Sequence, residues 1–183
     1  MKTHLIAWFV CAGCSTSIVA AAPVSTYAGQ QTREIKALSQ DDVNAYLSGK
    51  GMALAKAAEL NGYAGPAHVL ELSEELALTP DQRARTEALF ATMTAQAVSL
   101  GQALVEQERK LDRLFASRSV TSVAMLGTLD EIGALQAKIR AVHLEAHLAL
   151  ASVLTAAQQA RYAQFRGYAT TNDARQHGGQ HQH

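Results

Sequence analysis

Two long stretches with regularly spaced apolar residues dominate the hydrophobic pattern. In the first, from Pro80 to about Ala116, apolar positions recur at steps of four, four and three, and Glu108 interrupts one expected apolar position. These positions are Leu89, Met93, Ala97, Leu100, Leu104, Leu111 and Phe115. An eleven-residue period is close to that of a straight α-helix. The pattern therefore predicts one helix of roughly 55 Å, at about 1.5 Å per residue.

The second stretch begins after a polar break at Ser117-Arg118-Ser119, where Thr121 can cap a new helix. One apolar stripe along it comprises Leu135, Ile139, Val142, Ala146, Leu150 and Val153. Two long amphipathic helices with a short connection predict an elongated antiparallel helical hairpin.

The second helix also carries apolar residues on its opposite side, namely Leu126, Leu144 and Leu148. A second copy of the chain could cover this strip, which would make the protein a homodimer. Short helices from the N-terminal part of the same chain could cover it equally well. The pattern leaves both alternatives open.

Shorter elements flank the two long helices. Residues 29–38 are polar and aperiodic, which is typical of a linker, and Ser39-Gln40-Asp41-Asp42 is typical of a helix start. Turn residues follow up to Gly65-Pro66, and His68–Ala77 is predicted to form another short helix. The predicted fold is all-α, with a helical domain over residues 39–168.

Composition agrees with one helical domain. The chain has 183 residues, 48% of them hydrophobic, and only three prolines. Lys and Arg number 16, as do Asp and Glu, so no strong net charge favours nucleic acid as a partner.

Residues 1–28 are predicted to be a signal peptide. Lys2 precedes the apolar run Leu5–Val10, which is shorter than the roughly 20 residues that cross a bilayer. We therefore expect export to the periplasm, with cleavage in the small residues before residue 29. Both cysteines, Cys11 and Cys14, lie in this segment, so a lipoprotein tether at Cys14 is the alternative.

The most specific local motif occurs twice. Leu78-Thr79-Pro80-Asp81-Gln82 opens the first long helix, with Thr79 as the cap and Gln82 closing a capping box. Leu154-Thr155-Ala156-Ala157-Gln158 repeats the arrangement at the start of a short final helix. Leu78, Thr79, Gln82, Leu154, Thr155 and Gln158 are therefore predicted to have structural roles.

This pair of Leu-Thr-x-x-Gln elements resembles the signature of the Spy/CpxP and heavy-metal-resistance family, over roughly His68 to Tyr168. The resemblance implies an elongated helical hairpin, commonly a homodimer with a concave surface, in the periplasm. The family contains ATP-independent chaperones, metal sensors and regulators of envelope stress. Implied partners are therefore unfolded proteins or a membrane stress sensor.

Histidine is the residue type that points to chemistry. His143 and His147 are four residues apart on the second long helix, and this spacing can chelate a transition metal such as Zn, Cu, Ni or Co. The alternative is a pair of histidines at the edge of the core. Glu145 lies about 160° around the helix from each histidine, so a zinc-peptidase site is excluded. The resemblance adds His68 as a third ligand, and Glu71 one turn later could supply an oxygen.

The tail, residues 169–183, contains His177, His181 and His183 and is predicted to be a flexible second metal-binding segment. No phosphate loop, cysteine cluster or nucleophile–base pair is recognisable, so we expect neither an enzyme nor an organic cofactor. The leading interpretation is a periplasmic metal-binding protein of stress or heavy-metal resistance. The alternatives are an ATP-independent chaperone and a regulatory adaptor.

Overall fold

A computed structural model describes residues 23–168, and no strand occurs among them. The chain divides into two compact units, residues 1–31 and 32–183, which we treat separately. The described part of the first unit consists of turns that lead into the 3-10 helix η1 (Gln30–Thr32). The predictions for residues 1–22, including cleavage and the tether at Cys14, lie outside the described residues. So do the tail histidines His177, His181 and His183.

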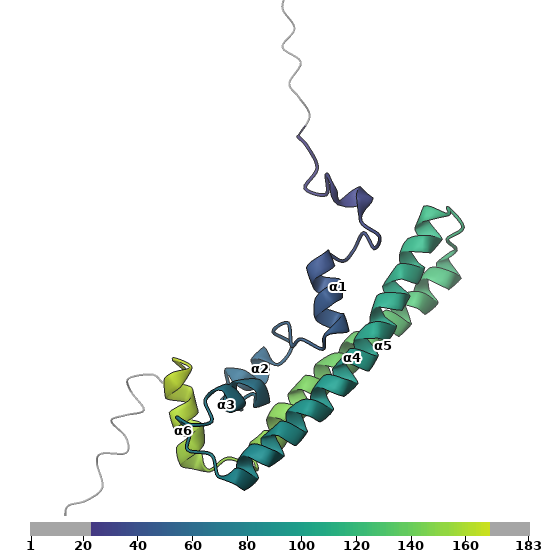
Figure 1. Cartoon of the computed structure of the whole chain (residues 1–183). Coiled ribbons are helices and arrows are strands. Elements are labelled where there is room, and N and C mark those ends of the chain that lie inside the picture. Colours follow the sequence, from purple (N-terminus) through teal and green to yellow (C-terminus); the bar gives the residue numbers. More distant parts are fainter. Residues whose placement is uncertain (1–22, 169–183) are drawn as a thin grey trace, which may run out of the picture. The chain divides into compact units, whose positions relative to one another are not determined.

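Two long helices, α4 (Pro80–Ala116) and α5 (Ser122–Leu150), pack against each other in the second unit (Figure 1). The early part of α4 meets the late part of α5, since Leu89 packs against the cluster that contains Leu150. Leu104 lies farther along α4 and packs in a second cluster with Ile132 of α5. Both long helices therefore occur where the sequence predicted them, and Thr121 caps α5 as expected.

The four shorter helices are α1 (Gln40–Leu47), α2 (Lys56–Glu59), α3 (Pro66–Glu71) and α6 (Ala156–Phe165). Helix α1 packs on α4, α2 packs on α5, and α3 contacts both long helices. Helix α1 starts as predicted, because Ser39 and Asp42 form a capping box.

The short helix expected over His68–Ala77 has different bounds in the structure. It begins at Pro66, because proline fits the first turn of a helix, and it ends at Glu71. Turns follow up to Ala77, whose φ of 49° is incompatible with a continuing right-handed helix.

The segment expected to be a linker is attached to α4 over its last residues. Ile35 is buried, Lys36 bonds Asp112 at 3.0 Å, and Glu34 bonds Arg109 at 2.7 Å. Each ion pair has one exposed partner and one partly buried partner, so solvent screens the pairs and they contribute little by themselves. Burial of Ile35 is therefore the main interaction that holds this segment on the second unit. The polar, aperiodic sequence of the segment did not predict this burial.

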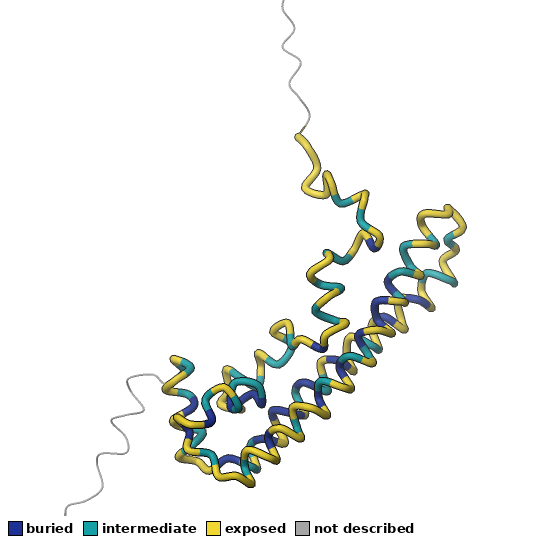
Figure 2. The backbone as a smooth tube through the Cα atoms, in the orientation of Figure 1, coloured by how far each residue is buried: buried dark blue, intermediate teal, exposed yellow. Residues whose placement is uncertain are grey.

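The core consists of two separate apolar clusters, and Figure 2 shows buried residues along the facing sides of the long helices. The first cluster lies where α3 and α6 meet the two long helices, and the second lies under α1. The buried members of the first cluster are Ala64, Val69, Leu76, Leu150, Leu154 and Tyr162. Those of the second cluster are Leu104, Ile132 and Ile139. Between them, α4 contributes residues near Phe90 and α5 contributes His143 and His147.

The second apolar strip of α5 is not covered by the short helices. Leu126 and Leu148 are 55% and 63% exposed, and Leu144 is half-buried. Of the two alternatives that the sequence left open, coverage by N-terminal helices of the same chain is therefore wrong.

The two Leu-Thr-x-x-Gln elements bond directly to each other. Gln82 Nε2 donates to Gln158 Oε1 and Gln158 Nε2 donates to Gln82 Oε1, both at 2.9 Å. Each Oε1 also accepts the backbone N–H of its own cap residue, Thr79 or Thr155. The second hydrogens of the amides go to the carbonyls of Val153 and Leu76. Both capping boxes are thus confirmed, and together they form one closed structure that we call the glutamine clasp.

We expect the two glutamines to be energetically coupled. Gln82→Ala and Gln158→Ala should each lower the free energy of unfolding by about 1–3 kcal/mol, because each leaves the other amide partly unpaired. The double variant should lose less than the sum of the singles, by about 0.5 kcal/mol or more. Urea unfolding of the four proteins measures this coupling. Gln102→Ala, at an exposed position of α4, is the control, and strict additivity would contradict the clasp.

Gly101 allows α1 to approach α4 closely. A Cβ at this position would clash with the backbone carbonyl of Tyr46, whereas a Cβ at Gly133 of α5 would meet no atom within 4 Å. Gly101→Ala should therefore destabilise the protein by about 1–3 kcal/mol through overpacking. Gly133→Ala should stabilise it by about 0.5–1 kcal/mol, since alanine is the better helix former. Thermal unfolding compares the two, and equal effects would disprove the close contact.

Candidate functional site

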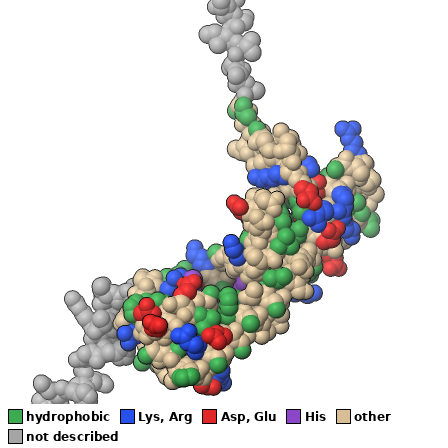
Figure 3. Space-filling view, in the orientation of Figure 1, with side chains coloured by type: hydrophobic (Ala, Val, Ile, Leu, Met, Phe, Trp, Pro, Cys, Tyr) green, Lys and Arg blue, Asp and Glu red, His purple; other side chains and the backbone are tan. Residues whose placement is uncertain are grey.

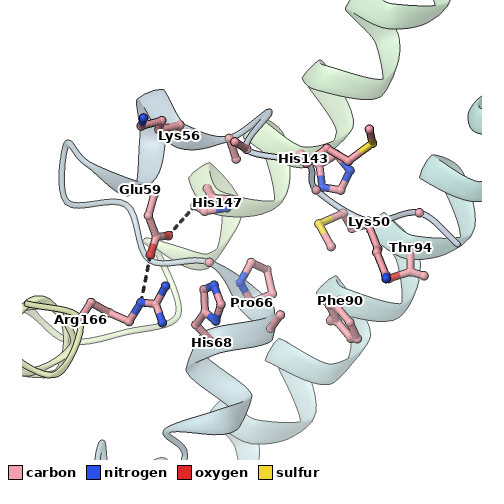
Figure 4. A pocket seen from close by; sticks show the side chains of 18 of the residues that line it. Lys50, Lys56, Glu59, Pro66, His68, Phe90, Thr94, His143, His147 and Arg166 are labelled. Carbon is pink, nitrogen blue, oxygen red and sulfur yellow. Dashed lines mark ion pairs between the residues drawn. The ribbon is translucent and has the colours of Figure 1, made fainter. Parts of the chain in front are cut away.

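A cavity of about 620 Å³ lies in the gap between the two core clusters. The connection between α1 and α2 forms one wall together with α2 and the start of α3, and residues of α4, α5 and the end of α6 complete it. Figure 4 shows the side chains that line it. Figure 3 shows histidine side chains (purple) between the short and long helices, with Lys and Arg side chains (blue) close by.

His143 is the most deeply buried titratable residue at this cavity, with only 3% of its surface exposed. Its Nε2 is buried and has no hydrogen-bond partner among the described residues. Burial lowers the pKa of the imidazole below its ordinary value of 6.5, and the nearby His147 lowers it further. At neutral pH the ring is therefore neutral, and none of residues 23–168 satisfies its Nε2.

His147 lies one turn later on α5 and is 9% exposed. Its Nδ1 donates to the backbone carbonyl of Tyr63 at 2.8 Å, so in a neutral ring Nε2 carries the free lone pair. Gly65 makes room for the ring, since a Cβ there would come within 3.1 Å of His147 Nε2. The chain near Gly51 and Gly65 lies against His143 and His147, so both rings are more deeply buried than the helical pattern alone indicated.

Glu59 of α2 connects His147 with α6. Its Oε2 lies 3.7 Å from His147 Nδ1, and its Oε1 accepts a 2.6 Å hydrogen bond from the Tyr162 hydroxyl. Arg166 lies 3.5 Å from the same carboxylate. Burial and the bond to Glu59 raise the pKa of Tyr162, which keeps its proton on the donated bond. Glu59 thus holds the short helices in place around His147.

His68 lines the same cavity from α3, but its Nδ1 pairs with Glu71 Oε2 at 2.9 Å. The structure therefore brings His68, His143 and His147 to one cavity without joining them in one ligand set. No group of three His, Cys, Asp or Glu residues within residues 23–168 is placed to hold a metal ion. Glu71, predicted as an oxygen donor, serves His68 instead.

The remaining lining is mostly apolar with cationic residues near it. Met52, Phe90 and Met93 contribute apolar surface, and Lys50, Lys56 and Arg166 contribute positive charge. Glu59 is the acidic residue that lines the cavity. The cavity therefore combines imidazole nitrogens, thioethers and an excess of positive charge.

Sequence reasoning did not find Glu59, Tyr162 or Met52 as site residues. Glu59 lies in a four-residue helix, which is too short to show amphipathic periodicity. Tyr162 could have been singled out as an aromatic residue with a hydroxyl in a short capped helix, because a buried Tyr requires a partner.

The protein is all-helical over the described residues, and two joined Leu-Thr-x-x-Gln turns hold its helix starts together. A comparison with known protein families identifies the family that has this motif. Residues 66–166 match the LTXXQ motif family. The chain belongs to this family, whose motif is that of the Spy/CpxP-type periplasmic proteins. No curated protein and no solved structure matches the chain.

The lowered pKa of His143 predicts a pH-dependent stability. An unfolded chain gains a proton on this imidazole as the pH falls below about 6.5, whereas the folded chain resists protonation. The contribution of His143 to stability is therefore complete above pH 6.5 and is lost as the pH falls through its lower folded-state pKa. Urea unfolding of the metal-free protein between pH 7.5 and 5.5 measures the loss. His143→Gln should flatten this dependence, and an unchanged slope would refute the assignment.

Proposed function

We propose that this protein is a periplasmic transition-metal-binding protein of stress or heavy-metal resistance, with His143 and His147 as its main ligands. One observation carries the proposal: two buried imidazoles, one helical turn apart, line the same cavity. The buried Nε2 of His143 has no partner among the described residues, and the Nε2 of a neutral His147 ring carries a free lone pair. A buried polar atom without a partner is unfavourable in a folded protein unless something binds it.

The surroundings of His147 support metal ligation. Metal-binding histidines usually donate their second ring N–H to a carbonyl or carboxylate, which fixes the tautomer. The bond from His147 Nδ1 to the Tyr63 carbonyl is of this kind, with Glu59 behind it. The cavity supplies an access route for an ion. His68 could join the site if its ring rotated away from Glu71.

Imidazole ligands suit Zn, Cu, Ni and Co, and the tail would add a second, weaker mode through His177, His181 and His183. The ligands on α5 belong to a folded helix, whereas the tail has to lose conformational freedom when it coordinates an ion. We therefore propose that the helix mode binds more tightly per histidine.

The arrangement that we propose for the functional protein is a dimer of elongated helical hairpins. The exposed strip of Leu126, Leu144 and Leu148 on α5 supports this proposal, because short helices leave it open. Membership of the family, together with the charged and apolar start of the sequence, supports export to the periplasm.

An ATP-independent chaperone is the second candidate function, and exposed apolar side chains favour it. Val123, Leu126, Leu129 and Leu148 of α5 are all at least 42% exposed. Apolar surface of this kind can hold unfolded segments of other proteins. The strip and the cavity involve different residues of the chain, so each function can be tested separately.

Calorimetric titration with Zn²⁺, Ni²⁺ and Co²⁺ tests the metal proposal. The protein should show a tight phase and a weak phase, and removal of residues 169–183 should abolish only the weak one. Replacement of both His143 and His147 by Gln should remove the tight phase, with a loss of at least about tenfold in affinity.

His68→Gln is the matched control, and it should change the tight phase less than the double replacement does. Circular dichroism must confirm that the variants stay helical, because both histidines of α5 are buried. Tight binding that survives the double replacement would disprove the site. Failure of every ion to bind, together with suppressed aggregation of unfolded clients, would favour the chaperone.

A further inference from the structure

We infer that the cavity prefers a soft monovalent ion, Cu(I), and that Met93 and Met52 supply thioether ligands beside His143 and His147. This inference rests on the proposed metal-binding function and names the ion and its further ligands. Met93 on α4 and Met52 in the connection between α1 and α2 line the same cavity as the two histidines. Thioether sulfur is drawn among the side chains around His143 in Figure 4.

The set of available donors argues against a preference for Zn²⁺. Zn²⁺ is usually held by four protein ligands, or by three with one open position, from Cys, His, Asp or Glu. Among residues 23–168 no group of three such side chains is placed to hold an ion. The soft donors at the cavity, besides the imidazoles, are the thioethers of Met52 and Met93. Thioethers are soft ligands that select Cu(I) over harder divalent ions.

Glu59 is the carboxylate that would otherwise favour a divalent ion. Its Oε1 is engaged by Tyr162 at 2.6 Å and by Arg166 at 3.5 Å, and its Oε2 lies near His147 Nδ1. The carboxylate therefore acts behind the ligand His147 rather than on the ion. The ligand set of two neutral imidazoles and thioethers carries no charge.

Positive charge around the cavity acts in the same direction. Lys50, Lys56 and Arg166 line it, and Coulomb repulsion of an ion doubles when its charge doubles. An uncharged ligand set offsets this repulsion less well for a divalent ion than for a monovalent one. A monovalent ion is repelled half as strongly and gains the same soft ligands.

The two methionines have different settings. Met93 is buried, at 9% exposure, on the long helix α4, and it lines the same cavity as His143 and His147 of α5. Met52 is 38% exposed in a connection and has a φ of 43°. Met93 belongs to the apolar stripe of α4 and would pack there in any case. Met93 is a candidate ligand because it lines a cavity together with His143, whose imidazole has an unpartnered nitrogen. The flexible methionine side chain allows its sulfur to move toward an ion.

The test compares Cu(I) with Zn²⁺ in the full exported chain whose tail histidines His177, His181 and His183 are replaced by Gln. Cu(I) affinity is measured anaerobically by competition with a chromophoric Cu(I) chelator, and Zn²⁺ affinity by competition with a zinc dye. Met93→Leu keeps nearly the same volume, so the fold should persist. We expect Cu(I) binding to weaken at least about tenfold, and further in the Met52→Leu/Met93→Leu variant, with Zn²⁺ affinity nearly unchanged.

Met125→Leu, on α5 and not part of the cavity lining, is the matched control and should leave both affinities unchanged. X-ray absorption at the copper edge should detect sulfur neighbours in the parent protein and fewer in the double variant. Unchanged Cu(I) affinity and only nitrogen neighbours would overturn the inference while the histidine site stands. Absence of binding by Cu(I) and by all divalent ions would overturn the proposed function itself.

Discussion

The glutamine clasp is the interaction on which the remaining structure depends. Gln82 and Gln158 each close a capping box and also bond each other, so two helix starts that are far apart in sequence become one unit. The motif leucines attach the clasp to the first core cluster, because Leu154 is a buried member of it and Leu78 packs against it. With the start of α4 fixed to the start of α6, the turns after α3 and the end of α5 are confined to the same small space.

The cavity follows from this arrangement and from the spacing of the core. The first cluster is closed by the clasp and the second by α1, which approaches α4 at Gly101. Between the two clusters, α5 places imidazoles rather than leucines against the segment of residues 51–65. Apolar packing therefore stops at His143 and His147, and a chain of polar contacts through Glu59 and Tyr162 replaces it. The site is polar because the core is interrupted there.

Local rules predicted the long elements well and the site only in part. Thr79, Thr121 and Thr155 mark helix starts through bonds to residues three positions away, and the apolar steps along α4 are equally local. The pairing of His143 with His147 needed only the period of a helix. Burial of both rings and the contact with Glu59 depend on how residues 51–65 fold back over α5. Turns at Gly49 and Gly62 determine that path, and glycine alone does not specify its direction.

The bonds that join the helix starts are separate from the residues that line the cavity. The clasp uses backbone groups and two amides, so it fixes the fold without requiring any particular residue at positions 52, 93, 143 or 147. Substitution at those positions changes the donors at the cavity while both helix caps remain intact. The exposed apolar strip of α5, with Leu126 and Leu148, involves none of the cavity residues. One clasped scaffold therefore carries a cavity and an exposed apolar strip, and substitutions in either leave the bonds that hold the helix starts together intact.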